Sequence, residues 1–360
     1  MSALRARIAE LIETTGPISV SQYWALCLYD PIDGYYMTRE PFGRGGDFTT
    51  APEVSQMFGE MVALWVHGAW QAAGAPQRFV LAEIGPGRGT LMKDMLRTLA
   101  KAAPALVDAA EVRLVEVSPR LRAVQADTLA GATGRIGWDD RVEQLPEGPL
   151  VIVGNEIFDA LPIRQYVKAG GRWRERMVAL DGAGNLAFHA GAGMPDPALL
   201  PPDAADAAEG AIAELSPARA GLMDIIASRI AGEGGAGLFL DYGYLSPSTG
   251  DTLQALHRHA PDDSLAHPGE ADLTSHVDFA ALAEAARAHG LRTAAMTQAD
   301  FLLAMGLLER AGRLGTPLDE AGRDRIRADV ERLAGPQQMG DLFKALCVGA
   351  TTPLPAPFEA

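Results

Sequence analysis

Residues 81–90 read LAEIGPGRGT, an apolar run that ends in three glycines at alternate positions. Glycine allows a sharp turn and a close approach by a ligand, because no Cβ stands in the way. Where a strand meets a helix, such a turn also presents the amides of the first helical turn. The stretch therefore predicts a strand, a ligand-binding turn and a helix. The spacing of Gly85, Gly87 and Gly89 indicates the class of ligand.

The stretch belongs to an alternation of apolar strands and helical patterns that begins at Phe79. Such an alternation is typical of a parallel sheet with crossover helices. Over 164–190 the pattern changes to alternating apolar and polar residues around glycine turns, as in a β-hairpin. We expect a helical N-terminal region with a lid loop over 1–78, and a ligand-binding α/β domain over 79–360 with an insertion at about 164–215.

Composition excludes several classes of protein. The chain has 360 residues and a net charge of −15, which opposes binding to the phosphates of nucleic acids. No apolar run approaches the ~18 residues of a membrane span, so we expect no membrane insertion. Residues 1–16 mix arginine with glutamate, unlike a secretory signal or a transit peptide, and this favours a cytoplasmic protein.

Neither cysteines nor histidines form a recognised pattern. Cys27 and Cys347 lie far apart in apolar contexts, which indicates neither a disulfide framework nor a metal motif. His257, His259 and His267 have no recognised metal spacing with cysteine or acidic partners. The sequence therefore predicts no metal.

The glycine spacing separates the nucleotide-binding classes. A dinucleotide fingerprint is G-x-G-x-x-G, and a P-loop requires Lys and Ser/Thr after its glycines, so the G-x-G-x-G of residues 85–89 fits neither. The segment EIGPGRG resembles motif I of class I S-adenosylmethionine (SAM) methyltransferases, in which a glycine loop passes under the amino-acid part of the cofactor. A tight structural turn is the alternative interpretation. Glu116, at the end of the second predicted strand, stands where doubly wound folds place the acid that binds ribose hydroxyls.

Longer segments extend the resemblance over nearly the whole chain. The most distinctive are DPIDGYY (30–36), GGDFTTAPEVSQMFGE (45–60), EIGPGRGTLMKDML (83–96), VEVSPRLRAVQ (115–125), GNEIFDALPIRQ (154–165), LDYGY (240–244), ADLTSHVDF (271–279) and GDLFKAL (340–346). By these segments the chain resembles the MidA-like family of SAM-dependent methyltransferases. The resemblance implies a Rossmann-like class I sheet. It also implies a protein substrate, because mitochondrial members assist the assembly of respiratory complex I by methylating an arginine of one subunit.

The resemblance implies which residues bind SAM, and its product S-adenosylhomocysteine. Asp47 and Phe48 would belong to a lid over the cofactor, and Trp138 with Asp139 or Asp140 would contact the adenine. The alternative for Trp138, Asp139 and Asp140 is a solvated acidic turn. The full predicted set is Glu83, Gly85, Pro86, Gly87, Gly89, Thr90, Glu116, Ser118, Trp138, Asp139, Asp47 and Phe48.

The predicted catalytic residues lie in two later segments of the chain. In GNEIFDALP, Glu156 and Asp159 could hold one guanidinium through paired hydrogen bonds, beside Asn155. The alternative is that Asn155 and Asp159 cap a turn and the following helix. In SHVDF, His276 could accept a proton, or Ser275 or Asp278 could cap a helix.

Thr50 and Glu53 stand at capping-box spacing before a helix that we expect to start near Val54. Three alternatives to arginine methylation remain: a small-molecule methyltransferase, an assembly factor that binds SAM without turnover, and a dehydrogenase. The sequence indicates neither the acceptor nor the oligomeric state.

Overall fold

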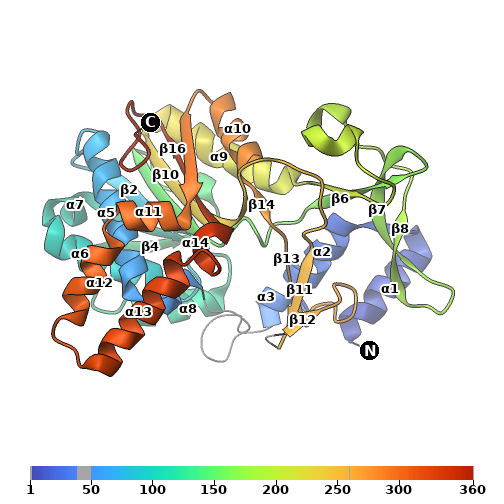
Figure 1. Ribbon diagram of the computed structural model, residues 1–360, viewed down its shortest axis with the longest axis horizontal. Coiled ribbons are helices and arrows are strands. Elements are labelled where there is room, and N and C mark those ends of the chain that lie inside the picture. The colour runs from blue at the N-terminus through green and yellow to red at the C-terminus, as the bar shows by residue number, and fades with distance from the viewer. Residues whose placement is uncertain (1, 39–49, 259, 360) are drawn as a thin grey trace. The chain divides into compact units, whose positions relative to one another are not determined.

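The computed structural model describes residues 2–38, 50–258 and 260–359 (Figure 1). The chain divides into two compact units, each assembled from segments that are distant in sequence. The first unit is Met1–Phe48, Phe158–Gly221 and Ser246–His276, and the second is Thr49–Ile157, Leu222–Leu245 and Val277–Ala360. The sequence predicts a boundary near residue 78. Segments of the two units alternate along the sequence instead. The helix over 56–72 belongs to the second unit because it packs against strands of the α/β sheet and a helix that covers it.

The second unit contains the predicted α/β sheet. Its strands are β2 Phe79–Ile84, β3 Ala110–Val115, β4 Arg135–Asp139, β5 Leu150–Asn155, β10 Gly235–Tyr244, β14 Val277–Asp278, β15 Arg292–Thr297 and β16 Phe343–Gly349. Its helices are α4 Ala51–Val54, α5 Gln56–Ala72, α6 Thr90–Ala102, α7 Pro104–Ala109, α8 Pro119–Thr128, a 3₁₀ turn Val142–Gln144, α10 Phe279–Ala288, α11 Gln298–Ala304, α12 Leu307–Gly315, α13 Glu320–Ala334 and α14 Met339–Leu342. Helix α9, Pro217–Glu233, has residues in both units.

The main path of this sheet runs β15-β16-β10-β5-β2-β3-β4, and β14 pairs with β10. Strands β4, β3, β2, β5 and β10 are parallel neighbours, whereas β16 runs antiparallel to β10 and β15. Every residue of β2 and β5 is buried, as expected for central strands covered on both faces. From β2 the chain continues to β3, which pairs with one edge of β2. It later returns as β5, which pairs with the other edge of β2. Ligands bind at such a switch point, outside the carboxyl ends of the strands.

The core of the second unit explains why residues 49–78 join the sheet. Helix α5 is buried on all sides over residues 57–63, and its Met57, Trp65 and Val66 belong to one core with Leu81 of β2 and Met95 of α6. Helices α12 and α13 lie side by side (Figure 1). The apolar pattern of α5 therefore predicts its burial correctly, and the sheet is its partner.

The first unit contains the predicted hairpin insertion. Its elements are α1 Ala3–Thr15, β1 Ile18–Ser19, α2 Val20–Tyr29, α3 Tyr35–Thr38, β6 Arg164–Ala169, β7 Arg172–Leu180, β8 Leu186–Ala190, 3₁₀ turns Pro197–Leu199 and Pro202–Ala205, β9 Ile212–Leu215, β11 Gln254–His257, β12 Ala260–Asp262 and β13 Asp272–Thr274. An antiparallel sheet runs β1-β7-β6-β9, with β8 on β7. Ile18 pairs with Val178, so the N-terminal segment completes the sheet. Trp24 is fully buried in the core of this unit.

The region between Tyr244 and Ser275 contains a second small sheet. Strand β11 pairs antiparallel with β12 on one side and with β13 on the other. Leu273 and Ala255 face each other across β13 and β11, and both side chains are buried. These strands are three or four residues long, too short for their periodicity to stand out in a sequence rich in Asp, His and Pro.

The predicted capping box at Thr50 is wrong. The side chain of Thr50 makes no capping bond, and the expected single helix is broken at Ser55, which has extended backbone angles. Ser55 instead caps α5 by accepting a hydrogen bond from the Met57 amide. Glu53 accepts a hydrogen bond from the Thr90 hydroxyl, so a tertiary partner replaces the local bond.

Membrane insertion was not expected, and none of the helices that the structure describes is sufficiently long and apolar to cross a bilayer.

Candidate functional site

The three glycines of the motif adopt left-handed backbone angles. The φ values are +64° at Gly85, +53° at Gly87 and +81° at Gly89. Non-glycine residues are strained in this region, so the turn requires glycine for conformation as well as for space. A Cβ on Gly85 would lie 2.7 Å from the Cδ1 atom of Ile157. The turn is closed by a hydrogen bond from the Gly89 amide to the Pro86 carbonyl oxygen.

Helix α6 begins directly after this turn. Its N-cap is Gly89, which has no side chain to accept a hydrogen bond from the first helical amides. These amides and the positive end of the helix dipole attract an electron-rich ligand group. The hydroxyl of Thr90 is bonded to Glu53 at the start of the helix. The turn therefore offers backbone donors beside β2, as the sequence predicts.

Glu83 is a buried acid at the end of β2. Its side chain is 3% exposed, and Oε2 has no hydrogen-bond partner among the described residues. Burial raises the pKa of Glu83 to about 8, although a hydrogen bond from the Met92 amide opposes the shift. A buried polar atom without a partner is costly, so its retention beside the glycine turn points to a ligand group as the partner.

The raised pKa of Glu83 makes stability depend on pH. The folded protein holds a proton here up to about pH 8, whereas the unfolded chain releases it near 4.5. The folded state therefore binds more protons in this window, and the free energy of unfolding falls as pH rises through it. We expect cofactor-free protein to lose roughly 3–4 kcal/mol between pH 5 and 8 from this group. Urea unfolding at both pH values should show a flatter dependence in Glu83→Gln. An equal pH dependence in the two proteins would exclude Glu83 as the cause.

Glu116 follows β3, and its two oxygens are held by neighbouring donors. The Ser118 amide donates to Oε1 at 2.7 Å, and Gln125 Nε2 donates to Oε2 at 3.2 Å. Burial raises the pKa of Glu116, and these hydrogen bonds act in the opposite direction. A carboxylate has about four acceptor positions, so Glu116 keeps acceptor capacity for a diol. Ser118 itself caps α8.

Gln125 is a residue of this region that sequence reasoning missed. It is fully buried, and its Nε2 also donates to the Gly87 carbonyl oxygen at 2.8 Å, while its Oε1 accepts from Trp138 Nε1 at 2.9 Å. Gln125 thus links the glycine turn, Glu116 and Trp138. A signal existed in the sequence, because Gln125 stands four residues after Leu121 on the buried face of α8.

Trp138 and Asp139, at the end of β4, stay predicted adenine contacts. Both oxygens of Asp139 pair with Arg113 at 2.7 Å, and the Asp139 carbonyl oxygen accepts from the Glu116 amide. The Asp140 carboxylate is 59% exposed and pairs with Arg122 at 2.6 Å. The Asp139 carboxylate therefore has a structural partner, and Asp140 is the more accessible of the two acids.

Asn155 and Glu156 lie at the carboxyl end of β5. Asn155 Nδ2 donates to Glu156 Oε1 at 3.0 Å, and Asn155 Oδ1 is buried without a partner among the described residues. Glu156 has a φ of +52°, a left-handed conformation that is rare for a residue with a side chain. Its amide donates to the Leu240 carbonyl oxygen of β10. Strain of this kind persists where surrounding bonds enforce it, and it concentrates at functional sites.

The other two predicted catalytic residues, Asp159 and His276, belong to the first unit. There Arg219, which is 4% exposed, binds both segments through its guanidinium. Its Nη2 donates to the Asp159 carbonyl oxygen at 3.1 Å and to Ser275 Oγ at 2.6 Å, and its Nη1 donates to the His276 carbonyl oxygen at 2.6 Å. The structure therefore brings Asp159 and His276 to one buried arginine, which no motif had indicated.

Two further predictions have different outcomes. Asp278 caps α10 by accepting from the Ala281 amide, which bears out the capping alternative for this residue. The predicted lid residues Asp47 and Phe48 lie outside the described residues.

The residues of the second unit suit SAM. The glycine turn offers room and amides for the amino-acid part, Glu83 Oε2 is a buried polar atom that a ligand group would satisfy, and Glu116 retains acceptor capacity for a ribose diol. All of them lie at or just after the carboxyl ends of β2 and β3, beside the switch point. The fold and this cradle define the α/β class of enzymes that bind an adenosine-containing cofactor.

The comparisons with known proteins identify the family. Residues 61–297 match the family described as "Putative S-adenosyl-L-methionine-dependent methyltransferase". A crystal structure of a Burkholderia thailandensis protein bound to S-adenosyl-homocysteine has a TM-score of 0.86 and 32% identity, and the match covers 96% of this chain and 92% of that one. The chain belongs to this family and is a SAM-dependent methyltransferase, as the sequence predicts.

Curated relatives cover almost the whole chain. The Danio rerio protein named "Protein arginine methyltransferase NDUFAF7, mitochondrial" is 35% identical over 365 residues, or 95% of this chain and 85% of that protein. The Homo sapiens protein of the same name is 34% identical over 367 residues, or 92% and 80%. The predicted cytoplasmic location is wrong, because these relatives are mitochondrial by name. The prediction rested on the composition of residues 1–16, which does not determine a compartment.

Proposed function

We propose that this methyltransferase transfers the methyl group of SAM to an arginine side chain of a partner protein. The observation that carries the proposal is the strained backbone of Glu156, which fixes a carboxylate at the end of β5, next to the buried Asn155. The names of the relatives support the choice of arginine as acceptor.

Arginine methylation requires orientation of a cation that stays charged at any working pH. SAM supplies an electrophilic methyl group on a sulfonium ion when it is bound. A carboxylate such as Glu156 would hold the guanidinium by charge-assisted hydrogen bonds and direct one nitrogen toward the methyl group. Localising positive charge on the bound nitrogens leaves the attacking nitrogen more nucleophilic. As the bond from nitrogen to the methyl carbon forms, the bond from that carbon to sulfur would break, S-adenosylhomocysteine would leave, and the nitrogen would lose one proton. Asp159 and His276, which belong to the first unit, stay predictions from the sequence.

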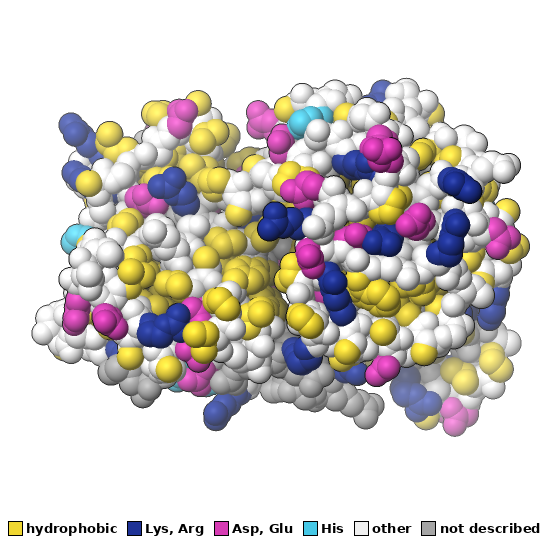
Figure 2. Space-filling view, turned by 180° about the vertical axis from the view of Figure 1, so that it is seen from behind, with side chains coloured by type: hydrophobic (Ala, Val, Ile, Leu, Met, Phe, Trp, Pro, Cys, Tyr) yellow, Lys and Arg dark blue, Asp and Glu magenta, His cyan; other side chains and the backbone are white. Residues whose placement is uncertain are grey.

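As the partner we propose a subunit of respiratory complex I, which the resemblance to the MidA-like family implies. The net charge of −15 favours a cationic segment on the substrate. Acidic and basic side chains are interspersed over the face shown in Figure 2, which has no single acidic patch. Single carboxylates such as Glu156 are therefore better candidates for recognition of the arginine than the electrostatic field of the whole surface.

The proposal is tested with purified enzyme, methyl-labelled SAM and an extract of cells that lack the gene. We expect label in a protein band, because the substrate should be unmethylated in such cells. An extract of the parent cells should accept much less label. Label confined to small molecules would favour a small-molecule acceptor. Absence of any transfer, with SAM bound, would favour an assembly factor without turnover.

A further inference from the structure

Two histidines and an aspartate meet in the first unit, outside the residues assigned above. His257, Asp262 and His267 each offer a ligand atom, and these atoms lie within 4.8 Å of one another. Elsewhere in residues 2–38, 50–258 and 260–359 no other such group of three occurs. We propose that this cluster binds a divalent transition-metal ion, and that zinc suits its ligands.

The register of the β11–β12 hairpin places two of the ligands together. His257 pairs with Ala260, and Ala255 pairs with Asp262. Paired residues point to the same face of a sheet, as do residues two apart along one strand. His257 and Asp262 therefore share a face as diagonal neighbours, and the distance between His257 Nδ1 and Asp262 Oδ2 is 3.8 Å.

The third ligand comes from the loop between β12 and β13, which is held by its own hydrogen bonds. The Leu265 amide donates to Asp263 Oδ1 at 2.8 Å, and the amides of Glu270 and Ala271 donate to the His267 carbonyl oxygen. The Tyr23 hydroxyl donates to the Ser264 carbonyl oxygen at 2.7 Å. His267 is thus brought to the hairpin by an ordered loop, and its ring centre lies 4.3 Å from that of His257.

The distances fit a metal after small side-chain rotations. Ligand atoms of a tetrahedral zinc site lie about 3.4 Å apart, given metal–ligand bonds of about 2.0–2.2 Å. The present separations from Asp262 Oδ2 are 2.6 Å to His267 Nδ1 and 3.8 Å to His257 Nδ1, on either side of that value.

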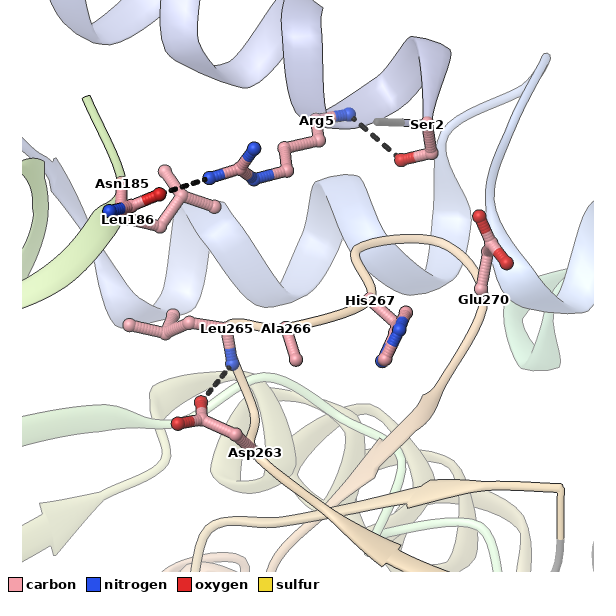
Figure 3. Close-up of a pocket in the computed structure, with 9 residues that line it drawn as sticks. All are labelled: Ser2, Arg5, Asn185, Leu186, Asp263, Leu265, Ala266, His267 and Glu270. Carbon is pink, nitrogen blue, oxygen red and sulfur yellow. Dashed lines mark hydrogen bonds between the residues drawn. The ribbon is translucent and has the colours of Figure 1, made fainter. Parts of the chain in front are cut away.

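The ligand types select the class of ion. Calcium and magnesium prefer oxygen ligands alone, whereas imidazole nitrogen suits zinc and its first-row neighbours. Two imidazoles and one carboxylate leave a fourth position for water or another ligand. His267 is 45% exposed and lies in the wall of a cavity of about 390 Å³, so an ion has access (Figure 3).

The cavity wall also carries charged groups. Figure 3 shows Arg5, Glu270 and Asp263 around the same space as His267. Arg5 donates to Asn185 Oδ1 at 3.2 Å. The wall therefore presents both signs of charge beside the histidine, and the three proposed ligands must supply the affinity.

This proposal departs from the prediction of no metal. That prediction used sequence spacing, and the intervals from His257 to Asp262 and from Asp262 to His267 match no recognised motif. Spacing on a helix or in a zinc knuckle is informative because its geometry is fixed locally. Here the fixed geometry comes from strand register and from a loop that returns to the hairpin, which a motif search does not include.

The test is isothermal titration of untagged, chelator-stripped full-length protein with zinc chloride. We expect one zinc per chain. Removing a ligand should weaken binding by at least the roughly 10- to 100-fold that loss of an outer partner costs. This applies to His257→Ala, His267→Ala and Asp262→Asn. The matched control is His289→Ala, because His289 also pairs with an aspartate, Asp224 at 2.5 Å, but belongs to no group of three.

A second readout guards against variants that fail to fold. Zinc should raise the unfolding temperature of the parent protein and of the His289→Ala control, but not that of Asp262→Asn, which keeps the shape of the side chain. Absence of zinc binding to the parent protein at micromolar zinc would overturn the proposal. Binding of equal strength in Asp262→Asn and both histidine variants would overturn it as well.

Discussion

Replacing Gly87 with valine should reduce the affinity for SAM by at least about 100-fold, a loss of about 2.7 kcal/mol. Gly87 has a φ of +53°, where a residue with a Cβ is strained by about 1–2 kcal/mol. A valine side chain would in addition enter the space that the bare turn leaves for the cofactor. The carbonyl oxygen of Gly87 is also fixed by Gln125, so the turn cannot easily adopt another conformation. Calorimetric titration with SAM measures the loss.

A matched control separates strain from obstruction. Gly131 has a φ of +82°, a Cβ added there would have no neighbouring atom within 4 Å, and the residue lies in the same unit but outside the turn. Gly131→Val should therefore show a comparable backbone penalty with unchanged SAM binding. Undiminished binding in Gly87→Val would show that the cofactor lies elsewhere.

The second large effect concerns turnover. Glu156→Gln should lower kcat by about 100-fold or more, the range for removing a group that stabilises charge in a transition state. The amide preserves size and can still bond to Asn155, so the dissociation constant of SAM should stay within about twofold, as expected for an interaction made with the acceptor. Initial rates at saturating SAM, together with calorimetry, test both parts.

Glu143→Gln is the matched control, because it neutralises an exposed acid of the same unit. It should leave both the rate and SAM binding unchanged. Full activity in Glu156→Gln would remove this residue from the acceptor site. A parallel loss of SAM binding would instead place it in the cofactor site.

The glycine turn and the strands next to it could be predicted from the sequence, because their geometry depends on residues close together in the chain. Each part of LAEIGPGRGT acts within about ten residues: an apolar strand, a turn that needs glycine, and a helix start. The apolar runs around Val112 and Val151 likewise indicate buried parallel strands, and the structure contains them as β3 and β5. The positions of Glu83 and Glu116 at strand ends follow from the same pattern.

The features that sequence reasoning missed depend on distant partners. Arg219 binds carbonyl oxygens that are 56 to 60 residues away, and no local pattern indicates that a buried arginine lies there. The strain at Glu156 arises where β5 ends, beside β10. Glu53, which was predicted to complete a capping box, instead accepts a hydrogen bond from Thr90, 37 residues further along the chain. In each case a tertiary contact overrides or supplies what local spacing cannot specify.

Tandem mass spectrometry of the labelled protein from the extract reaction locates the transferred methyl group. We expect it on a guanidinium nitrogen of an arginine, in a complex I subunit, with little label when Glu156→Gln replaces the parent enzyme. Replacing that arginine with lysine in the purified subunit should abolish the signal. Methyl groups found instead on carboxylates or on a small molecule, or labelling that survives the arginine-to-lysine change, would contradict arginine methylation by this enzyme.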